Sequence, residues 1–255
     1  MDNIAIFTDI HGNIPALEAV LEDIEKRAIS TIYCLGDFIG KGPNPNETIA
    51  LCKKYCTQSI LGNWDDFLLY SSKDGMPISW YRQIISEESK EYLASLPKVI
   101  DFYLSGHIVR LFHAHPFDLY KRLYQLTDQE HMFLYEKDNP EFSIQKNADI
   151  VGYGDIHYSF QKSFQKRILF NTGSAGNPLD GTTAPYVILH GELHNPELEP
   201  FSMEYEFLMI TNVPSKMPNS RICHKKRTIF LKLRREYSVC SAIKNKHTKK
   251  SDFVC

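Results

Sequence analysis

Short apolar runs and longer amphipathic stretches alternate through the N-terminal part of the chain. Residues 4–8 are almost wholly apolar and stop at an aspartate, which predicts a buried strand. Residues 14–28 carry apolar side chains at helical spacing and predict a helix with one buried face. The pattern repeats with a strand over 31–35, a helix over 46–55 and a strand over 58–61. This β-α-β-α-β order predicts a parallel sheet with right-handed crossovers.

The rest of the chain is predicted to be helical at first and rich in strands later. Residues 66–96 have helical character, and 118–146 are predicted to be helical and irregular. Between them, 99–104 and 108–112 predict a hairpin. Further strands are expected at 150–153, 159–164, 168–171, 186–189 and 199–207. This order favours an α/β protein with two packed sheets flanked by helices.

The composition is that of a folded globular protein. The chain has 255 residues, 43% of them hydrophobic, with 13 Gly and 13 Pro, which excludes a disordered or fibrous chain. No apolar run approaches the roughly 18–20 residues of a membrane span, so we expect no membrane partner. The N-terminus has neither the basic nor the long apolar segment of a signal peptide. Six cysteines without a framework spacing predict reduced thiols and a cytoplasmic location.

Charge is distributed unevenly along the chain. Residues 1–215 hold 17 basic and 29 acidic side chains, whereas 216–255 hold 12 basic and 2 acidic ones. The acidic body is not expected to bind nucleic acid. We therefore expect one domain over 1–210, with a helical insert at about 66–146, followed by a basic C-terminal tail over 211–255. Three interpretations of the tail remain open: a disordered basic arm, an altered reading frame at the end of the gene, or an extension that touches RNA or a membrane.

Polar side chains with metal-binding chemistry follow the predicted strands. Asp9 and His11 lie two residues apart after the first strand, so on an extended backbone both side chains leave the same face. Alone, such a pair is more often a turn aspartate and an ordinary polar histidine. The order of donors along the chain is more informative, because ligands bind beyond the carboxyl ends of strands in open α/β sheets. That order is Asp9-Ile10-His11, Gly36-Asp37, Gly62-Asn63, His113-Ala114-His115 and Gly154-Asp155-Ile156-His157.

These blocks, in this order, resemble the calcineurin-like metallophosphoesterase family. The subgroup is similar to bacterial and archaeal single-domain phosphoesterases related to diadenosine tetraphosphate hydrolases. The segments 8–13, 35–43 and 171–178 also match closely, and the resemblance covers about residues 1–207. It implies a four-layer α-β-β-α sandwich of two mixed sheets flanked by helices.

The resemblance also implies a dinuclear metal centre. Two cations a few ångströms apart stabilise the attacking and leaving oxygens of an in-line phosphoryl displacement, and a bridging water that loses its proton is the nucleophile. Mixed nitrogen and oxygen donors without cysteine suit Mn, Fe, Zn or Co, of which we favour Mn. The implied ligands are Asp9, His11 and His157 for one ion, Asn63, His113 and Asp155 for the other, and Asp37 as the bridge.

Two positions depart from the family pattern. Asp155 stands where the family has histidine. If Asp155 ligates, it adds a third carboxylate, which favours harder ions; if it cannot reach, a water intervenes and the second site is weak. Our hypothesis is a labile second metal. Trp64 stands where many relatives have a histidine that assists the leaving group. Either His115 or Asp66 replaces that histidine, or the substrate has a good leaving group. Trp64 could stack on a base, although plain packing is the simpler interpretation.

We therefore predict a metal-dependent phosphoric ester hydrolase that acts on a phosphodiester or a nucleotide phosphoanhydride. Its substrate would be a small phosphorylated molecule that resembles a nucleotide. Asp37, His115 and Asp66 are the predicted catalytic residues, and Lys41, Asn63 and Trp64 are predicted to bind substrate. We also place Arg110 on the rim of the site. The alternatives are a phosphomonoesterase or protein phosphatase, and a non-catalytic metal-binding scaffold.

Overall fold

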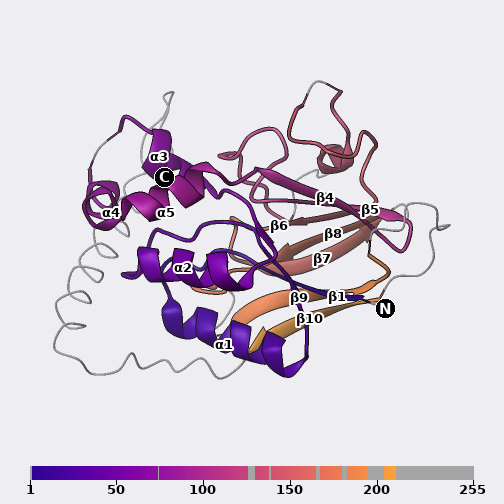
Figure 1. The fold of residues 1–255 in the computed structure, drawn as a ribbon. Helices are drawn as coiled ribbons and strands as arrows, with labels where there is room; N and C mark the ends of the chain where they lie inside the picture. The colour runs from indigo at the N-terminus through magenta and orange to yellow at the C-terminus, as the bar shows by residue number, and fades with distance from the viewer. Residues whose placement is uncertain are drawn as a thin grey trace, which may run out of the picture. The chain divides into compact units, whose positions relative to one another are not determined.

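The computed structural model describes residues 2–73, 75–125, 130–137, 139–164, 167–179 and 183–193, and the backbone of 204–210. The predicted basic tail over 211–255 lies outside the described residues. Within the described ranges, two mixed β-sheets face each other and α-helices lie beside the first sheet (Figure 1).

The first sheet has the strand order β10-β9-β1-β2-β3. Its parallel strands are β1 (Asp2–Phe7), β2 (Thr31–Cys34) and β3 (Gln58–Ser59). Strand β9 (Ala184–Gly191) runs antiparallel to β1, and β10 (Glu204–Ile210) runs antiparallel to β9. The predicted parallel arrangement of the first three strands is confirmed.

The second sheet has the order β4-β5-β6-β8-β7. Strands β4 (Val99–Leu104) and β5 (His107–Phe112) form the predicted hairpin. Strand β6 (Ile150–Tyr153) lies parallel to β5 and to β8 (Arg167–Thr172), and β7 (Ser159–Phe164) lies antiparallel to β8. Both sheets therefore mix parallel and antiparallel pairs.

The first helix begins with a side-chain N-cap. Helix α1 (Ile14–Lys26) begins at Asn13, whose side chain accepts a hydrogen bond from the backbone N–H of Ala16. The other α-helices of the described residues are α2 (Pro45–Tyr55), α3 (Asn63–Tyr70), α4 (Ile78–Ile84) and α5 (Glu87–Ala94). None of the helices in the described ranges is long and apolar enough to cross a membrane.

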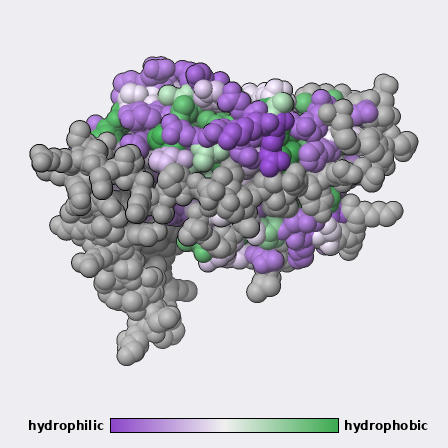
Figure 2. Space-filling model, turned by 90° about the horizontal axis from the view of Figure 1, so that it is seen from below, coloured by the Kyte–Doolittle hydropathy of each residue, from purple (hydrophilic) through white to green (hydrophobic). Residues whose placement is uncertain are grey.

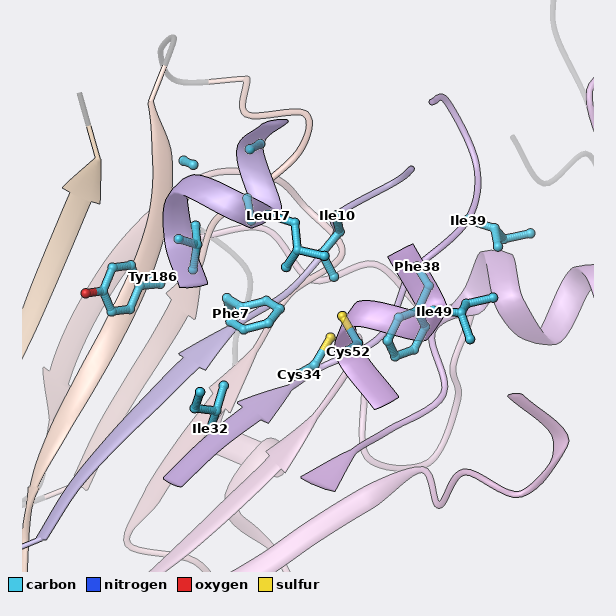
Figure 3. Close-up of a cluster of buried hydrophobic side chains, with 14 of the residues drawn as sticks. Phe7, Ile10, Leu17, Ile32, Cys34, Phe38, Ile39, Ile49, Cys52 and Tyr186 are labelled. Atoms are coloured by element: carbon cyan, nitrogen blue, oxygen red, sulfur yellow. The ribbon is translucent and has the colours of Figure 1, made fainter. Parts of the chain in front are cut away.

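Three buried hydrophobic clusters separate four layers. The first lies between the helices and the first sheet and includes Phe7 and Leu17 (Figure 3). In it, the free thiols of Cys34 on β2 and Cys52 on α2 point toward one another. The second cluster fills the space between the sheets, and the third covers the outer face of the second sheet. The four-layer fold is thus confirmed. On the face that Figure 2 shows, hydrophobic residues of the described chain are scattered in small spots among hydrophilic ones.

The outer layer on the second sheet is mostly irregular. Within the described part of 118–146, the one regular element is the 3-10 helix η1 (Glu130–Phe133). Arg110, predicted on the rim of the site, is instead fully buried and binds Asp101 (Nε–Oδ1 2.7 Å). Its guanidinium also donates to the carbonyl oxygens of Ile144 and Lys146. The placement of Arg110 on the rim was wrong, because this side chain satisfies carbonyl groups that an irregular segment leaves unpaired.

Candidate metal centre

Five of the predicted ligands converge where strands of both sheets end. Asp9 and His11 follow β1, Asp37 follows β2, His113 follows β5, and His157 follows β6. Their ligand atoms form two groups, each with all atoms within 4.8 Å of one another. We call Asp9, His11 and His157 the first donor group, and Asp9, Asp37 and His113 the second donor group. Both groups are buried, so the fold places nitrogen and oxygen donors together away from bulk water.

Left-handed backbone turns aim these side chains into the site. The φ angles of Asp9, His11, Asp37 and His157 are 55°, 51°, 56° and 61°. Few residues other than glycine adopt positive φ, and such strain of about 1–3 kcal/mol per residue is typical of functional sites. The turns therefore serve the placement of the donors rather than the stability of the sheets.

Each histidine of the two donor groups is oriented by a backbone carbonyl. Because a carbonyl oxygen can only accept, the Nδ1 atoms of His11, His113 and His157 must carry the hydrogen. In the neutral form of each ring, Nε2 is then free of hydrogen and can bind a cation. The acceptors are the carbonyl oxygens of Ile39, Leu35 and Asn177, at 2.6, 2.7 and 2.7 Å.

The donor atoms are close but incompletely paired. Asp9 Oδ1 lies 3.0 Å from His157 Nε2 and 3.5 Å from His11 Nε2. Asp37 Oδ1 lies 3.5 Å from His113 Nε2. Among the described residues, Asp9 Oδ1 and His113 Nε2 are buried atoms that make no hydrogen bond. Buried polar atoms without partners are rare, and a metal ion would satisfy both.

A cation of the protein already lies at the first donor group. Lys41 Nζ is 3.0 Å from His157 Nε2 and 3.1 Å from His11 Nε2. Burial lowers the pKa of this ammonium, while the Asp9 and Asp37 carboxylates oppose the change. The ammonium marks the point where the donors of the group can hold a positive charge. The residues present therefore fit a metal ion, on the chemistry of the donors and on the position of this stand-in cation.

Burial and neighbouring charge set the protonation of the first donor group. Burial, assisted by Lys41, lowers the pKa of His11 to about 3, so its imidazole is neutral at neutral pH. Burial alone would raise the pKa of Asp9, but His157 and His11 hold it well below its usual range. An ionised carboxylate and a neutral imidazole are the forms that ligate a metal.

The second donor group holds a proton. Burial and the Asp9 charge raise the pKa of Asp37, although His113 opposes them. Burial alone would lower the pKa of His113, but the Asp37 and Asp9 carboxylates raise it to about 9. At neutral pH the Asp37–His113 pair therefore retains a proton that a metal ion would have to displace.

Asp155 and Asn63, both predicted ligands, contact each other beside the second donor group. Asn63 Nδ2 donates to Asp155 Oδ1 at 2.8 Å, which leaves the amide oxygen as the atom with ligand chemistry. Arg122 also binds Asp155, through Nε to Oδ2 at 3.0 Å and through Nη2 to Oδ1 at 3.1 Å. The backbone N–H of Asp155 donates to Asp9 Oδ2 at 3.0 Å. Sequence reasoning did not single out Arg122, since it lies in a loop without a motif.

Asp65 is a second residue that sequence reasoning missed. Its carboxylate accepts hydrogen bonds from the backbone N–H groups of Asp37 and Gly62, at 2.8 and 3.1 Å, and from those of Phe38 and Ile39. It therefore fixes the loop that carries Asp37. A signal was available, because an acid three residues after the N-cap, here Gly62, is the N3 half of a capping box. Gly62 is required here, since a Cβ would clash with the backbone nitrogen of Asp37.

Trp64 joins the site mainly through its backbone. Its N–H donates to Asp37 Oδ1 at 2.9 Å. Its indole packs on Gly40 and meets the ring of His11 edge-on, with 6.3 Å between ring centroids. Trp64 is partly buried and packs against the hydrophobic cluster beneath the helices. The packing role that we expected for this side chain is present, and it lies next to the first donor group.

The other two predicted catalytic residues are His115, which lies in the loop after β5, and Asp66, which contacts the same loop. The ring of His115 lies beside His131, with 5.0 Å between centroids, and its Nδ1 accepts from the backbone N–H of Phe117 at 3.1 Å. Burial lowers the pKa of His115 to about 4, so the ring is neutral at neutral pH. Its hydrogen is then on Nε2, a buried atom without a hydrogen-bond partner in the described chain. Asp66 Oδ2 accepts from the Tyr120 hydroxyl at 2.6 Å.

The turn over 173–178 supports the end of β1. Gly176 N–H donates to the carbonyl oxygen of Asp9 at 3.0 Å, and Ser174 Oγ donates to the same oxygen at 2.7 Å. The neighbouring carbonyl of Asn177 orients His157. The segment 171–178, which resembles the family closely, therefore contacts both Asp9 and His157. Ser174 Oγ also accepts from the backbone N–H of Asn177, so its hydroxyl is part of this framework.

Comparisons with known proteins give a family match and similar folds. Residues 3–193 match the calcineurin-like phosphoesterase superfamily domain. An uncharacterized protein of Methanocaldococcus jannaschii is 33% identical over 202 residues, which cover 70% of this chain and 78% of that protein. A metallophosphoesterase of Sphaerobacter thermophilus has a TM-score of 0.60 at 24% identity, over 74% of this chain and 83% of its own. A hypothetical protein of Pyrococcus horikoshii has a TM-score of 0.63 at 20% identity, over 91% of this chain and 94% of its own.

Proposed function

The chain belongs to the calcineurin-like phosphoesterase superfamily, and from this premise we propose that it is a dinuclear metal-dependent hydrolase of phosphodiesters or nucleotide phosphoanhydrides. That it is a hydrolase follows from the family. The metals, their number and the substrate are the proposal. A cytoplasmic location is also proposed, with the free thiols of Cys34, Cys52 and Cys56 as its support.

The observation that carries the proposal is the convergence of imidazole Nε2 atoms and carboxylate oxygens on two buried points. When bound, the ions, Mn favoured over Fe, Zn or Co, would supply Lewis acidity at the phosphoryl group and activate the attacking water. The residues that would hold them are Asp9, His11 and His157 at one point, Asn63, His113 and Asp155 at the other, and Asp37 between the two.

Lys41 is the proposed partner of the substrate phosphate. Its ammonium lies 3.0 Å from His157 Nε2, beside the donor atoms, so a phosphoryl group at the centre would come within its reach. It can counter negative charge that develops on the phosphoryl oxygens. Asn63 and Trp64 border the same region from the start of α3 and are proposed to contact substrate there.

His115 is the proposed group for the leaving oxygen, with Asp66 as the other candidate. A neutral His115 whose Nε2 carries a hydrogen can donate a hydrogen bond but is a poor source of a full proton at neutral pH. Asp66 already accepts a hydrogen bond from Tyr120. With Trp64 in place of the usual histidine, leaving groups that need little protonation are favoured. Phosphodiesters and phosphoanhydrides with nucleotide leaving groups meet this requirement.

The proposal is tested by hydrolysis of bis-p-nitrophenyl phosphate beside p-nitrophenyl phosphate, by protein freed of metal and then loaded with Mn²⁺. We expect diester turnover that needs Mn²⁺ and is lost in Asp37→Asn. Glu25→Gln, on the exposed side of α1, is the matched control and should keep full turnover. A preference for the monoester would favour the phosphomonoesterase alternative. No turnover of either substrate by Mn²⁺-loaded protein would favour the metal-binding scaffold.

A further inference from the structure

Asp155 is a buried carboxylate whose hydrogen-bonding capacity is almost filled. It accepts two hydrogen bonds from Arg122 and one from Asn63. A carboxylate has about four acceptor positions, so about one remains for any further partner. As a metal ligand, Asp155 would have to give up at least part of its contact with Arg122.

The two partners differ in exposure. The Asp155 side chain is 2% exposed, whereas that of Arg122 is 40% exposed, so the guanidinium reaches a buried anion from the surface. Leaving a buried carboxylate without a compensating cation is costly. Two cations can compensate Asp155: the guanidinium of Arg122, or a metal ion bound beside the second donor group.

We propose that Arg122 competes with the second metal ion for Asp155. The guanidinium binds Asp155 when no ion lies beside the second donor group, and it releases Asp155 when the ion binds. This inference rests on the proposed dinuclear function. On this inference, the metal ion beside the second donor group is the one that dissociates more easily. The cause is competition by the Arg122 guanidinium, and not the Asp155 carboxylate alone.

The contacts of the two protein cations explain why the second position is the weaker one. Lys41 reaches the first donor group through single contacts with two imidazole nitrogens. Arg122 binds its carboxylate with two parallel hydrogen bonds, the strong geometry for an arginine–carboxylate pair. A metal ion therefore displaces Lys41 more easily than Arg122.

Arg122 is also placed to move. It lies between β5 and η1, in a stretch without regular secondary structure among the described residues. The side chain can leave Asp155 without disturbing a strand of either sheet. An exposed tyrosine, Tyr124, also hydrogen-bonds its side chain and offers a contact near the surface.

The test is Mn²⁺ binding, measured on metal-free full-length protein by calorimetry and by equilibrium dialysis with metal quantification. In the wild type we expect two Mn²⁺ ions, the second bound at least about 10-fold more weakly. Arg122→Met should tighten the second ion about 10-fold and leave the first unchanged. Lys121→Met removes the same charge from an exposed neighbour and should change neither affinity. In an Asp155→Asn background, Arg122→Met should bring no gain, because the competition acts through the carboxylate.

Two results would overturn the inference. One is an unchanged second affinity in Arg122→Met whose folding is confirmed by its unfolding temperature. The other is a gain in the second Mn²⁺ affinity from Arg122→Met that persists in the Asp155→Asn background, which would show that the Arg122 charge acts through space. The milder Arg122→Lys keeps the charge but loses the paired hydrogen bonds, and it should give a smaller gain than Arg122→Met. Absence of any Mn²⁺ binding by the wild type would instead overturn the proposed function itself.

Discussion

His157 donates its Nδ1 hydrogen to the carbonyl oxygen of Asn177 at 2.7 Å. The contact ties a predicted ligand at the end of β6 to the turn that follows β8. The same turn binds the carbonyl oxygen of Asp9 through Gly176. Two members of the first donor group thus depend on a segment that contributes no member itself, an arrangement typical of metal sites.

Gly176→Ala should weaken the first metal ion. A Cβ at this position would clash with the carbonyl oxygen of Ile10, so the turn must shift and carry the Asn177 carbonyl away from His157. We expect Mn²⁺ affinity at the first donor group to fall about 10–100-fold, measured by calorimetry. Asn177→Ala keeps the carbonyl and should change the affinity far less. Equal losses in the two variants would contradict this role of the turn.

Asp65→Asn should destabilise the loop of Asp37. Both oxygens of the Asp65 carboxylate accept hydrogen bonds from backbone N–H groups. An amide has one acceptor oxygen, so its NH₂ group would face some of these N–H donors and leave them without an acceptor. We expect the free energy of unfolding, measured by urea denaturation, to fall by about 1–3 kcal/mol. Diester turnover should fall as well. Asp66→Asn, on the same helix, loses only a contact with Tyr120 and should cost less stability. The reverse order would refute the assignment.

Metal binding at the second donor group should release a proton. Burial alone would lower the pKa of His113, but the Asp37 and Asp9 carboxylates raise it to about 9, so the metal-free imidazole is protonated in the neutral range. Because the ion competes with this proton, its affinity should rise with pH up to about 9 and level off above.

The release can be measured as a dependence of the calorimetric binding enthalpy on the buffer, with HEPES and Tris compared at pH 7.5. His113→Asn should remove the part of this dependence that belongs to the second ion. Identical enthalpies in both buffers for the wild-type protein would show that no proton leaves, and would contradict the protonation described for the Asp37–His113 pair.

His115→Ala should slow the hydrolysis of substrates with poor leaving groups more than that of substrates with good ones. The wild-type ring offers a hydrogen on Nε2 that has no partner among the described residues. Its loss should cost about 10²-fold in turnover when the leaving group is weakly acidic. A series of aryl phosphodiesters of graded leaving-group pKa provides the measurement. A uniform effect across the series would exclude this role for His115.

The strand-end positions of the predicted ligands could be placed from the sequence because each follows an apolar run typical of a buried strand. Asp9, Asp37 and His113 needed no knowledge of distant contacts, and the order of the blocks supplied the family. The third strand was predicted over 58–61 but ends at Ser59. The Ile60 N–H still donates to the Cys34 carbonyl of β2, and the Leu61 N–H donates to the Pro97 carbonyl instead.

Charged residues with partners far along the chain could not be placed from the sequence. Arg110 is buried because Asp101 lies opposite it across the β4–β5 hairpin, a pairing that no local pattern reveals. Arg122 meets Asp155 only when its loop folds over the end of β6. In both cases the decisive fact is which carboxylate the fold brings to the guanidinium.

The central claim, that these donors form a metal centre, is tested most directly by anomalous X-ray diffraction from crystals soaked in Mn²⁺. We predict a peak in direct contact with Asp9 Oδ1 and the Nε2 atoms of His11 and His157, with Lys41 displaced. A weaker second peak should lie at the second donor group. Absence of a peak at both groups, with Lys41 Nζ still between the imidazoles, would contradict the account.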